Sequence, residues 1–154
     1  MTFLLFKKAL FLQLIPLNAS NKIEIVNRYT LESIATIQSG LDNPRYIAFA
    51  NGKGYVTNWG DGGVTSDDYV AVLNLSNYTI SGTIPVDEGP ERIVENNGNL
   101  YVAHQGGYGY GNTISVINAT SNSVSTTIPV GDVPNSLQVK NGVLYVMCGG
   151  KAAW

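Results

Sequence analysis

Short stretches in which apolar and polar residues alternate run along most of the chain, separated by polar turns. The stretches "LYVAH" and "NTISVI" are examples, as are "YVAVLN" and "YTISGTIPV". A period of two is typical of β-strands that bury one face, whereas no stretch after residue 20 shows the period of an amphipathic helix. Asn-Gly pairs at 51–52, 97–98 and 141–142 predict tight hairpins, because both turn residues need positive φ angles. The pattern therefore predicts an all-β fold.

The alternating stretches recur with a long period. Prolines at positions 44, 90 and 134 are each followed eleven residues later by a Tyr-Val pair, in "YVTN", "YVAH" and "YVMC". Successive copies lie 46 and 44 residues apart, and the length differences fall in presumed loops. Four short strands in a unit of this size are typical of a β-propeller blade. The sequence thus predicts a β-propeller of four-stranded antiparallel blades, with a half blade at 23–38, blades at 45–86 and 91–130, and a half blade at 135–148.

These units amount to about three blade equivalents, which is an incomplete arc, whereas closed propellers have roughly 4–8 blades. An open arc leaves strand edges exposed. The chain stops at Trp154, shortly after the third Tyr-Val pair. We therefore expect either that the sequence is a fragment of a longer propeller or that arcs self-associate to complete a ring.

The first twenty residues differ from the repeats. Lys7 and Lys8 precede an apolar run from Ala9 to Leu17, and small residues follow. This order is typical of a secretory signal peptide, although Leu17 stands where a small residue is preferred. The run is too short to span a bilayer. The sequence thus predicts a signal-like apolar leader at 1–20 before the propeller repeats at 21–154; the alternatives are an additional blade strand at "QLIPLN" or a misplaced start codon.

The repeat resembles a known family. "YVTN", "TIPVG" and "NGNLYV" are similar to the YVTN β-propeller repeats of surface-layer proteins and of YncE-like periplasmic proteins. The stretch "GLDNPRYIAFANGKGYVTNWGD" resembles surface propellers of bacterial outer membranes. The similarity covers residues 21–154, but His104 and Cys148 replace the motif asparagine Asn58 in the later copies. The resemblance implies export to the periplasm or cell surface and specifies no ligand.

Charge and composition narrow the function further. The net charge is −2 and the pI is about 5.2, so the chain lacks the basic surface that nucleic-acid binding requires. The single cysteine, Cys148, excludes an intrachain disulfide and a zinc site of the Cys-pair type. One histidine and one cysteine without an associated motif provide no nucleophile–base pair. We therefore expect no enzyme activity, no cofactor and no metal site.

One rim of the predicted propeller is the expected ligand-binding face. The loop before the first strand of each unit and the loop after the second strand lie at the same rim, and loops on a rigid scaffold commonly carry recognition. These loops include "NWGDGGVTSDD" and "QGGYGYGN". The candidate ligand-binding residues on this rim are Arg45, Asn58, Trp59, Asp61, Asp67, Asp68, Arg92, His104, Gln105, Tyr108 and Tyr110.

The aromatic candidates Trp59, Tyr108 and Tyr110 stand out, because glycines place the two tyrosines on a pliable loop. Flat rings offer stacking surface for sugars, corrin-like macrocycles or protein partners. The alternative is that they cover the base of their own loop. Arg45 and Arg92 either clamp an anionic ligand or pair with loop carboxylates.

The remaining candidates also have structural interpretations. The loop aspartates Asp61, Asp67 and Asp68 suit a solvated turn as well as a calcium site. His104 either binds a ligand or ends its strand in place of the motif asparagine. The tyrosines of the Tyr-Val pairs occupy one register of the repeat, and we expect them to be structural.

The sequence therefore predicts a non-catalytic binding or scaffold propeller of the bacterial cell envelope. Its partner is an unknown small molecule or envelope protein bound at the loop-rich rim, and membrane contact arises only through export or a partner. One alternative is a surface-layer or adhesive protein–protein module. Another, implied by the resemblance to outer-membrane propellers, is capture of a cobalamin-like small molecule for a TonB-dependent uptake system.

Overall fold

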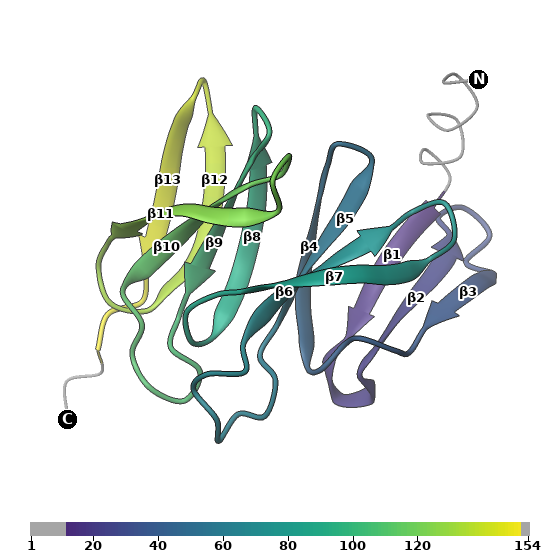
Figure 1. Ribbon diagram of the computed structural model, residues 1–154, viewed down its shortest axis with the longest axis horizontal. Helices are drawn as coiled ribbons and strands as arrows, with labels where there is room; N and C mark the ends of the chain where they lie inside the picture. Colours follow the sequence, from purple (N-terminus) through teal and green to yellow (C-terminus); the bar gives the residue numbers. More distant parts are fainter. Residues whose placement is uncertain (1–11, 152–154) are drawn as a thin grey trace.

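The computed structural model describes residues 12–151, and this part of the chain is built from β-strands with one short 3₁₀ turn (Figure 1). No helix within it is long and apolar enough to cross a membrane. The elements in chain order are β1 (Leu12–Leu17), η1 (Asn18–Ser20), β2 (Lys22–Asn27), β3 (Ser33–Ile37), β4 (Pro44–Ala50), β5 (Lys53–Asn58), β6 (Tyr69–Asn74), β7 (Thr79–Pro85), β8 (Pro90–Asn96), β9 (Asn99–His104), β10 (Thr113–Asn118), β11 (Ser123–Pro129), β12 (Pro134–Lys140) and β13 (Val143–Cys148).

The strands form four antiparallel sheets in which consecutive strands are neighbours. The sheets are β1-β2-β3, β4-β5-β6-β7, β8-β9-β10-β11 and β12-β13. The first strands of adjacent sheets are in contact, β1 with β4, β4 with β8 and β8 with β12, so the sheets stand side by side as radial blades (Figure 1). This arrangement confirms the predicted all-β fold with four-stranded antiparallel propeller blades.

The Asn-Gly pairs form the hairpins that the sequence predicts. Asn97 has a φ of +51° and Gly98 a φ of +78° in the turn between β8 and β9. The pairs at 51–52 and 141–142 also have positive φ angles at both residues, in the β4–β5 and β12–β13 turns. Two consecutive positive φ angles are typical of the type I′ turn, whose twist matches that of the flanking strands. The first two strands of each full blade are therefore held by a local turn.

The first sheet begins earlier than the predicted repeat boundary at residue 21. Leu12–Leu17 form β1, which pairs with β2 so that Leu14 lies opposite Ile25. Tyr55 lies opposite Val72 in the same register of the next blade, so Leu14 occupies the position of the repeat tyrosine. Part of the predicted leader is thus a blade strand, as in the alternative interpretation, because Leu14 is buried against β2 and the second blade. Residues 1–11 of that leader lie outside the described residues.

The hydrophobic core lies between the blades. Leu14 and Ile25 of the first sheet pack with Val56 of the second, and separate clusters join the second sheet to the third and the third to β12 and β13. A blade buries each apolar face only against an adjacent blade, as in other repeat proteins. The stability of each sheet therefore depends on its neighbour.

The repeat tyrosines are structural where a following blade is present. The ring of Tyr55 is fully buried, and its hydroxyl lies 3.0 Å from the carbonyl oxygen of Ala119 and 2.8 Å from Oδ1 of Asn122, both in the next blade. Tyr145 occupies the same register in β13, where 55% of its surface is exposed. Within the described residues, no further sheet covers that face of β13.

We expect the substitution Tyr55→Phe to lower the free energy of unfolding by about 1–2 kcal/mol, because it leaves buried acceptors without their donor. Tyr145→Phe removes the same hydroxyl from the same register and is expected to have almost no effect. Urea denaturation followed by circular dichroism measures both. Equal losses in the two variants would contradict the inter-blade role of Tyr55.

Candidate functional site

The long loops of the blades meet at one rim of the arc, as predicted. The backbone N–H of Val86 donates to the carbonyl of Asp68, and that of Gln105 donates to the carbonyl of Gly89. A further backbone bond joins Val133 to Gly111. Figure 1 shows these loops along the lower edge, while the Asn-Gly hairpins lie along the upper edge. Backbone hydrogen bonds therefore connect the rim loops between residues 68 and 133.

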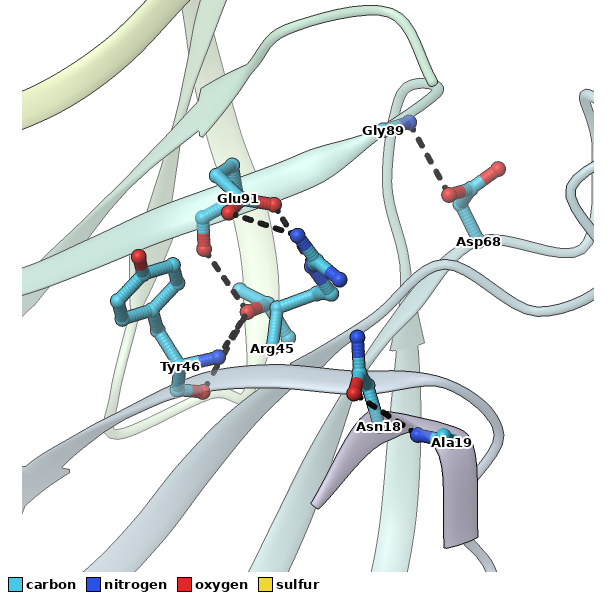
Figure 2. Close-up of polar contacts among 8 residues, drawn as sticks. Asn18, Ala19, Arg45, Tyr46, Asp68, Gly89 and Glu91 are labelled. Carbon is cyan, nitrogen blue, oxygen red and sulfur yellow. Dashed lines mark hydrogen bonds and ion pairs between the residues drawn. The ribbon is translucent and has the colours of Figure 1, made fainter. Parts of the chain in front are cut away.

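An ion pair joins two adjacent inner strands at this rim. Arg45 on β4 and Glu91 on β8 each follow a rim proline, so they hold equivalent positions in neighbouring blades. Nε of Arg45 donates to Oε2 of Glu91 at 2.9 Å, and Nη2 donates to Oε1 at 3.1 Å (Figure 2). Two parallel hydrogen bonds fix the relative orientation of both side chains. Glu91 is only 6% exposed, so this carboxylate is held inside the protein.

The local backbone explains why these side chains point to the same place. The pairing of β4 with β5 shifts register between Pro44 and Ile47, and the pairing of β8 with β9 shifts at the equivalent residues of its blade. Such irregularities change the direction in which a side chain points. Thr57 then locks the two strands together, because its hydroxyl accepts from the N–H of Tyr46 and donates to the carbonyl of Glu91.

Aromatic rings extend this ion pair towards the loops. The guanidinium of Arg45 lies 4.4 Å from the ring centroid of Trp59, and that of Arg92 lies 4.1 Å from the ring of Tyr46. The ring of Tyr108 meets Trp59 edge-on, with centroids 6.4 Å apart. Cation–π contacts of this kind stabilise a cation in a partly dry site. One connected cluster thus runs from Glu91 through Arg45 and Trp59 to Tyr108.

The aromatic candidates differ in exposure. Trp59 is 9% exposed, and its Nε1 has no hydrogen-bond partner among the described residues. Tyr108 is 84% exposed and Tyr110 is 52% exposed. Trp59 is therefore largely enclosed, whereas the two tyrosines present their surface to solvent.

The loop aspartates mainly organise the loops. Oδ2 of Asp67 accepts from the N–H of Asp61 at 2.9 Å, and Oδ1 of Asp68 accepts from the N–H of Gly89 at 3.1 Å. Burial raises the pKa of Asp68 from 3.8 to about 6, and the hydrogen bond from Gly89 opposes that rise. In the described part of the chain, no group of three or more histidine, cysteine, aspartate or glutamate side chains could hold a metal ion.

Two candidates lie inside the sheets and do not line the rim surface. Asn58 is fully buried, with Oδ1 accepting from the N–H of Asp42 and Nδ2 donating to the carbonyl of Val56. His104 is 1% exposed, and its Nε2 lies 2.9 Å from Oγ of Ser115. Burial lowers the pKa of His104 from 6.5 to about 4. Their expected contact with a ligand is therefore replaced by hydrogen bonds within the blade.

A pocket of about 260 Å³ opens beside the ion pair, where the first three sheets meet. Three of its residues, Asn18, Tyr46 and Glu91, were missed as candidates from the sequence. Arg45 and Glu91 have opposite charges at the same position of the repeat, which could have indicated their ion pair. Asn18 was not considered because it was assigned to the leader. The residues that line the pocket are Pro16, Asn18, Pro44, Arg45, Tyr46 and Glu91.

These features define an arc of a β-propeller with an aromatic and charged loop rim. No protein-family model matches the chain, and no curated protein matches it. Among solved structures, hydrazine synthase of Kuenenia stuttgartiensis is similar over 93% of this chain and 40% of its own, with 17% identity and a TM-score of 0.80. AztD from Citrobacter koseri matches over 72% of this chain and 29% of its own, with 19% identity and a TM-score of 0.53. Sqt1 of Saccharomyces cerevisiae matches over 94% and 43%, with 6% identity and a TM-score of 0.69.

The chain spans less than half the length of each of these three proteins. At such low identities the likeness concerns the fold alone. The similar structures support the propeller fold that the sequence resemblance implies. No family model matches, so the specific resemblance to YVTN or YncE-like repeats has no such support.

Proposed function

We propose that the chain is a non-catalytic binding or scaffold module of the bacterial cell envelope that recognises its ligand at the loop rim. The observation that carries this proposal is the exposure of Tyr108 and Tyr110 on a loop whose backbone is bonded to both neighbouring loops. Exposed rings on an anchored loop provide contact area at a low cost in conformational entropy.

The absence of catalysis in this proposal rests on the position of the histidine. His104 is enclosed between strands and has a lowered pKa, so it remains neutral near pH 7 and lacks contact with solvent. General acid–base catalysis requires a group within reach of the substrate. The rim cluster instead contains a cation, a buried carboxylate and aromatic rings, which suit binding.

The envelope location rests on the resemblance to exported propellers and on the leader-like sequence around Lys7 and Lys8. Cleavage after Ser20 would remove β1 and expose the core around Ile25. We therefore expect the exported chain to retain Leu12–Leu17. Mass spectrometry of the mature amino terminus measures this, and a start at Asn21 would contradict the role of β1 as a permanent strand.

The binding face can be tested with a photo-crosslinking amino acid at single positions. Placed at Tyr108 in the organism that encodes the chain, the probe is expected to crosslink to a partner after export. The matched control is Tyr29, an exposed tyrosine in the turn between β2 and β3 at the opposite rim. Equal or absent crosslinking at both positions would overturn the proposal.

A purified-protein assay separates small molecules from proteins as ligands. The variant Trp154→Phe leaves Trp59 as the single tryptophan, so its fluorescence reports on the rim. A saturable change with cyanocobalamin that is lost in Tyr108→Ala would support uptake of a small molecule. Crosslinks to an envelope protein without a cyanocobalamin response would support an adhesive or surface-layer role.

A further inference from the structure

The pocket beside the ion pair carries hydrogen-bond donors that have no acceptor within residues 12–151. Oδ1 of Asn18 accepts from the N–H of Ala19 at 2.8 Å, which fixes the orientation of the amide. Its Nδ2 then points towards the guanidinium of Arg45 (Figure 2). Arg45 donates through Nε and Nη2 to Glu91, and its Nη1 has no hydrogen bond within the described residues. Two donors from different blades therefore face one cavity.

The charge around the pocket favours an anion. Arg45 and Glu91 neutralise each other in their bidentate contact, and Glu91 uses both of its oxygens in that contact. Arg92, stacked on the wall residue Tyr46, adds a positive charge without a carboxylate partner in any described ion pair. Acceptor groups on a ligand would find donors here, whereas donor groups would compete with Arg45 for Glu91.

We propose that this pocket binds a carboxylate, either a free small acid or the carboxyl terminus of a peptide. One carboxylate oxygen accepts from Nδ2 of Asn18 and the other from Nη1 of Arg45, which is a charge-assisted contact. This inference rests on the proposed function, because it names the ligand chemistry of the same rim.

The volume of the pocket, about 260 Å³, is large enough for a bound group of several non-hydrogen atoms. A dicarboxylic acid such as succinate fits this volume, as does the last residue of a peptide. A larger ligand would insert its carboxylate end and leave the rest on the rim near Trp59.

The test uses neutral isosteres as matched probes. Succinate is compared with succinamide, and N-acetyl-glycyl-alanine is compared with its carboxamide. Binding is followed by NMR through the side-chain amide signals of Asn18 and the Nε–H signal of Arg45. We expect at least one carboxylate to bind tenfold or more tightly than its neutral counterpart and to shift both signals. The first pair responds if the source is a free acid, and the second if it is a peptide terminus.

The variant Asn18→Asp replaces the donor with an anion but keeps the oxygen that accepts from Ala19. Asn18 is exposed, so the substitution is compatible with folding. We expect carboxylate binding to weaken at least tenfold. The matched control Asn77→Asp makes the same charge change at the opposite rim, where Oδ1 accepts from the N–H of Thr79, and is expected to bind like the unmodified chain.

The inference is overturned if neither carboxylate is preferred over its neutral isostere, or if Asn18→Asp binds as well as Asn77→Asp. Crosslinking at Tyr108 that persists in either case would leave the rim as a binding face and remove only the carboxylate assignment. If the unmodified protein shows no crosslinking at Tyr108 above that at the control position Tyr29, the proposed function itself is wrong.

Discussion

Replacing Gly89 with alanine is expected to destabilise the protein by more than about 3 kcal/mol, in the range of large single-residue effects. Gly89 has a φ of +66°, and a Cβ atom built there would overlap the backbone nitrogens of Gly106 and Gly107. A backbone neighbour cannot rotate away as a flexible side chain can. The substitution must therefore separate the loop before β8 from the loop after β9.

Gly98→Ala provides a control for the backbone strain alone. Gly98 also has a positive φ, +78°, but no atom lies within 4 Å of a Cβ placed there. We expect that variant to lose about 1 kcal/mol, because only the left-handed conformation is penalised. Urea denaturation measures both free energies. Similar losses in the two variants would show that the close approach at Gly89 contributes nothing to stability.

The packing around Gly89 also changes the interpretation of the glycine-rich loop. From the sequence, the glycines around Tyr108 and Tyr110 indicate a pliable segment. In the structure, Gly106 and Gly111 lie where a Cβ would overlap backbone atoms of the same loop, so small residues are required by close packing. The two tyrosines are consequently presented by a tightly folded loop, and Gly89→Ala is expected to displace them.

The architecture could be predicted from the sequence because the repeat fixes register. The Tyr-Val pair that contains Tyr55 marks the second strand of the blade. The Asn-Gly pair before it marks the hairpin, and Tyr55 itself marks a buried face of the strand. The first strand could not be identified in this way, because Leu14 replaces the tyrosine and its apolar neighbours also satisfy the pattern of a signal peptide. Pairing with β2 and burial against the second blade decide the structure of residues 12–17.

The candidate site was predictable in outline only. The choice of rim and the exposed tyrosines Tyr108 and Tyr110 follow from loop length and composition. The contact between Arg45 and Glu91 depends on shifts in strand register that no local pattern reveals. His104 is the last residue of β9, and its side chain is buried against Ser115 of β10, a contact that the sequence of β9 alone does not reveal.

Acidification is expected to act in opposite directions on two buried groups, Asp68 in the rim loops and His104 inside the third sheet. The pKa of His104 falls from 6.5 in the unfolded chain to about 4, so its contribution to stability is present above pH 6.5 and is lost as the pH falls towards 4. The pKa of Asp68 rises from 3.8 to about 6, so its contribution is present below pH 3.8 and is lost as the pH rises towards 6. Each shift corresponds to up to about 3 kcal/mol. In the intact protein the two trends oppose each other between pH 4 and 6.

Single substitutions separate the two trends. Asp68→Asn keeps an oxygen that accepts from Gly89 and removes the buried carboxyl, so its free energy of unfolding relative to the unmodified protein should increase as the pH rises from 4 to 7. His104→Asn introduces the residue found in the equivalent position of the preceding blade and removes the buried imidazole. Its relative stability should increase as the pH falls from 7 to 4.

Urea denaturation at several pH values between 4 and 7.5 measures both differences, with the exposed Asp61→Asn as a control for the loss of one carboxylate. The informative quantity is the sign of each slope, because the other carboxylates of the chain contribute equally to all variants and cancel in the comparison. Slopes of the same sign in Asp68→Asn and His104→Asn would contradict the burial of one of these groups. Opposite slopes would show that both groups are buried in solution. The pKa of Asp68 is raised only when the rim loops are folded, and that of His104 is lowered only when β9 and β10 are packed.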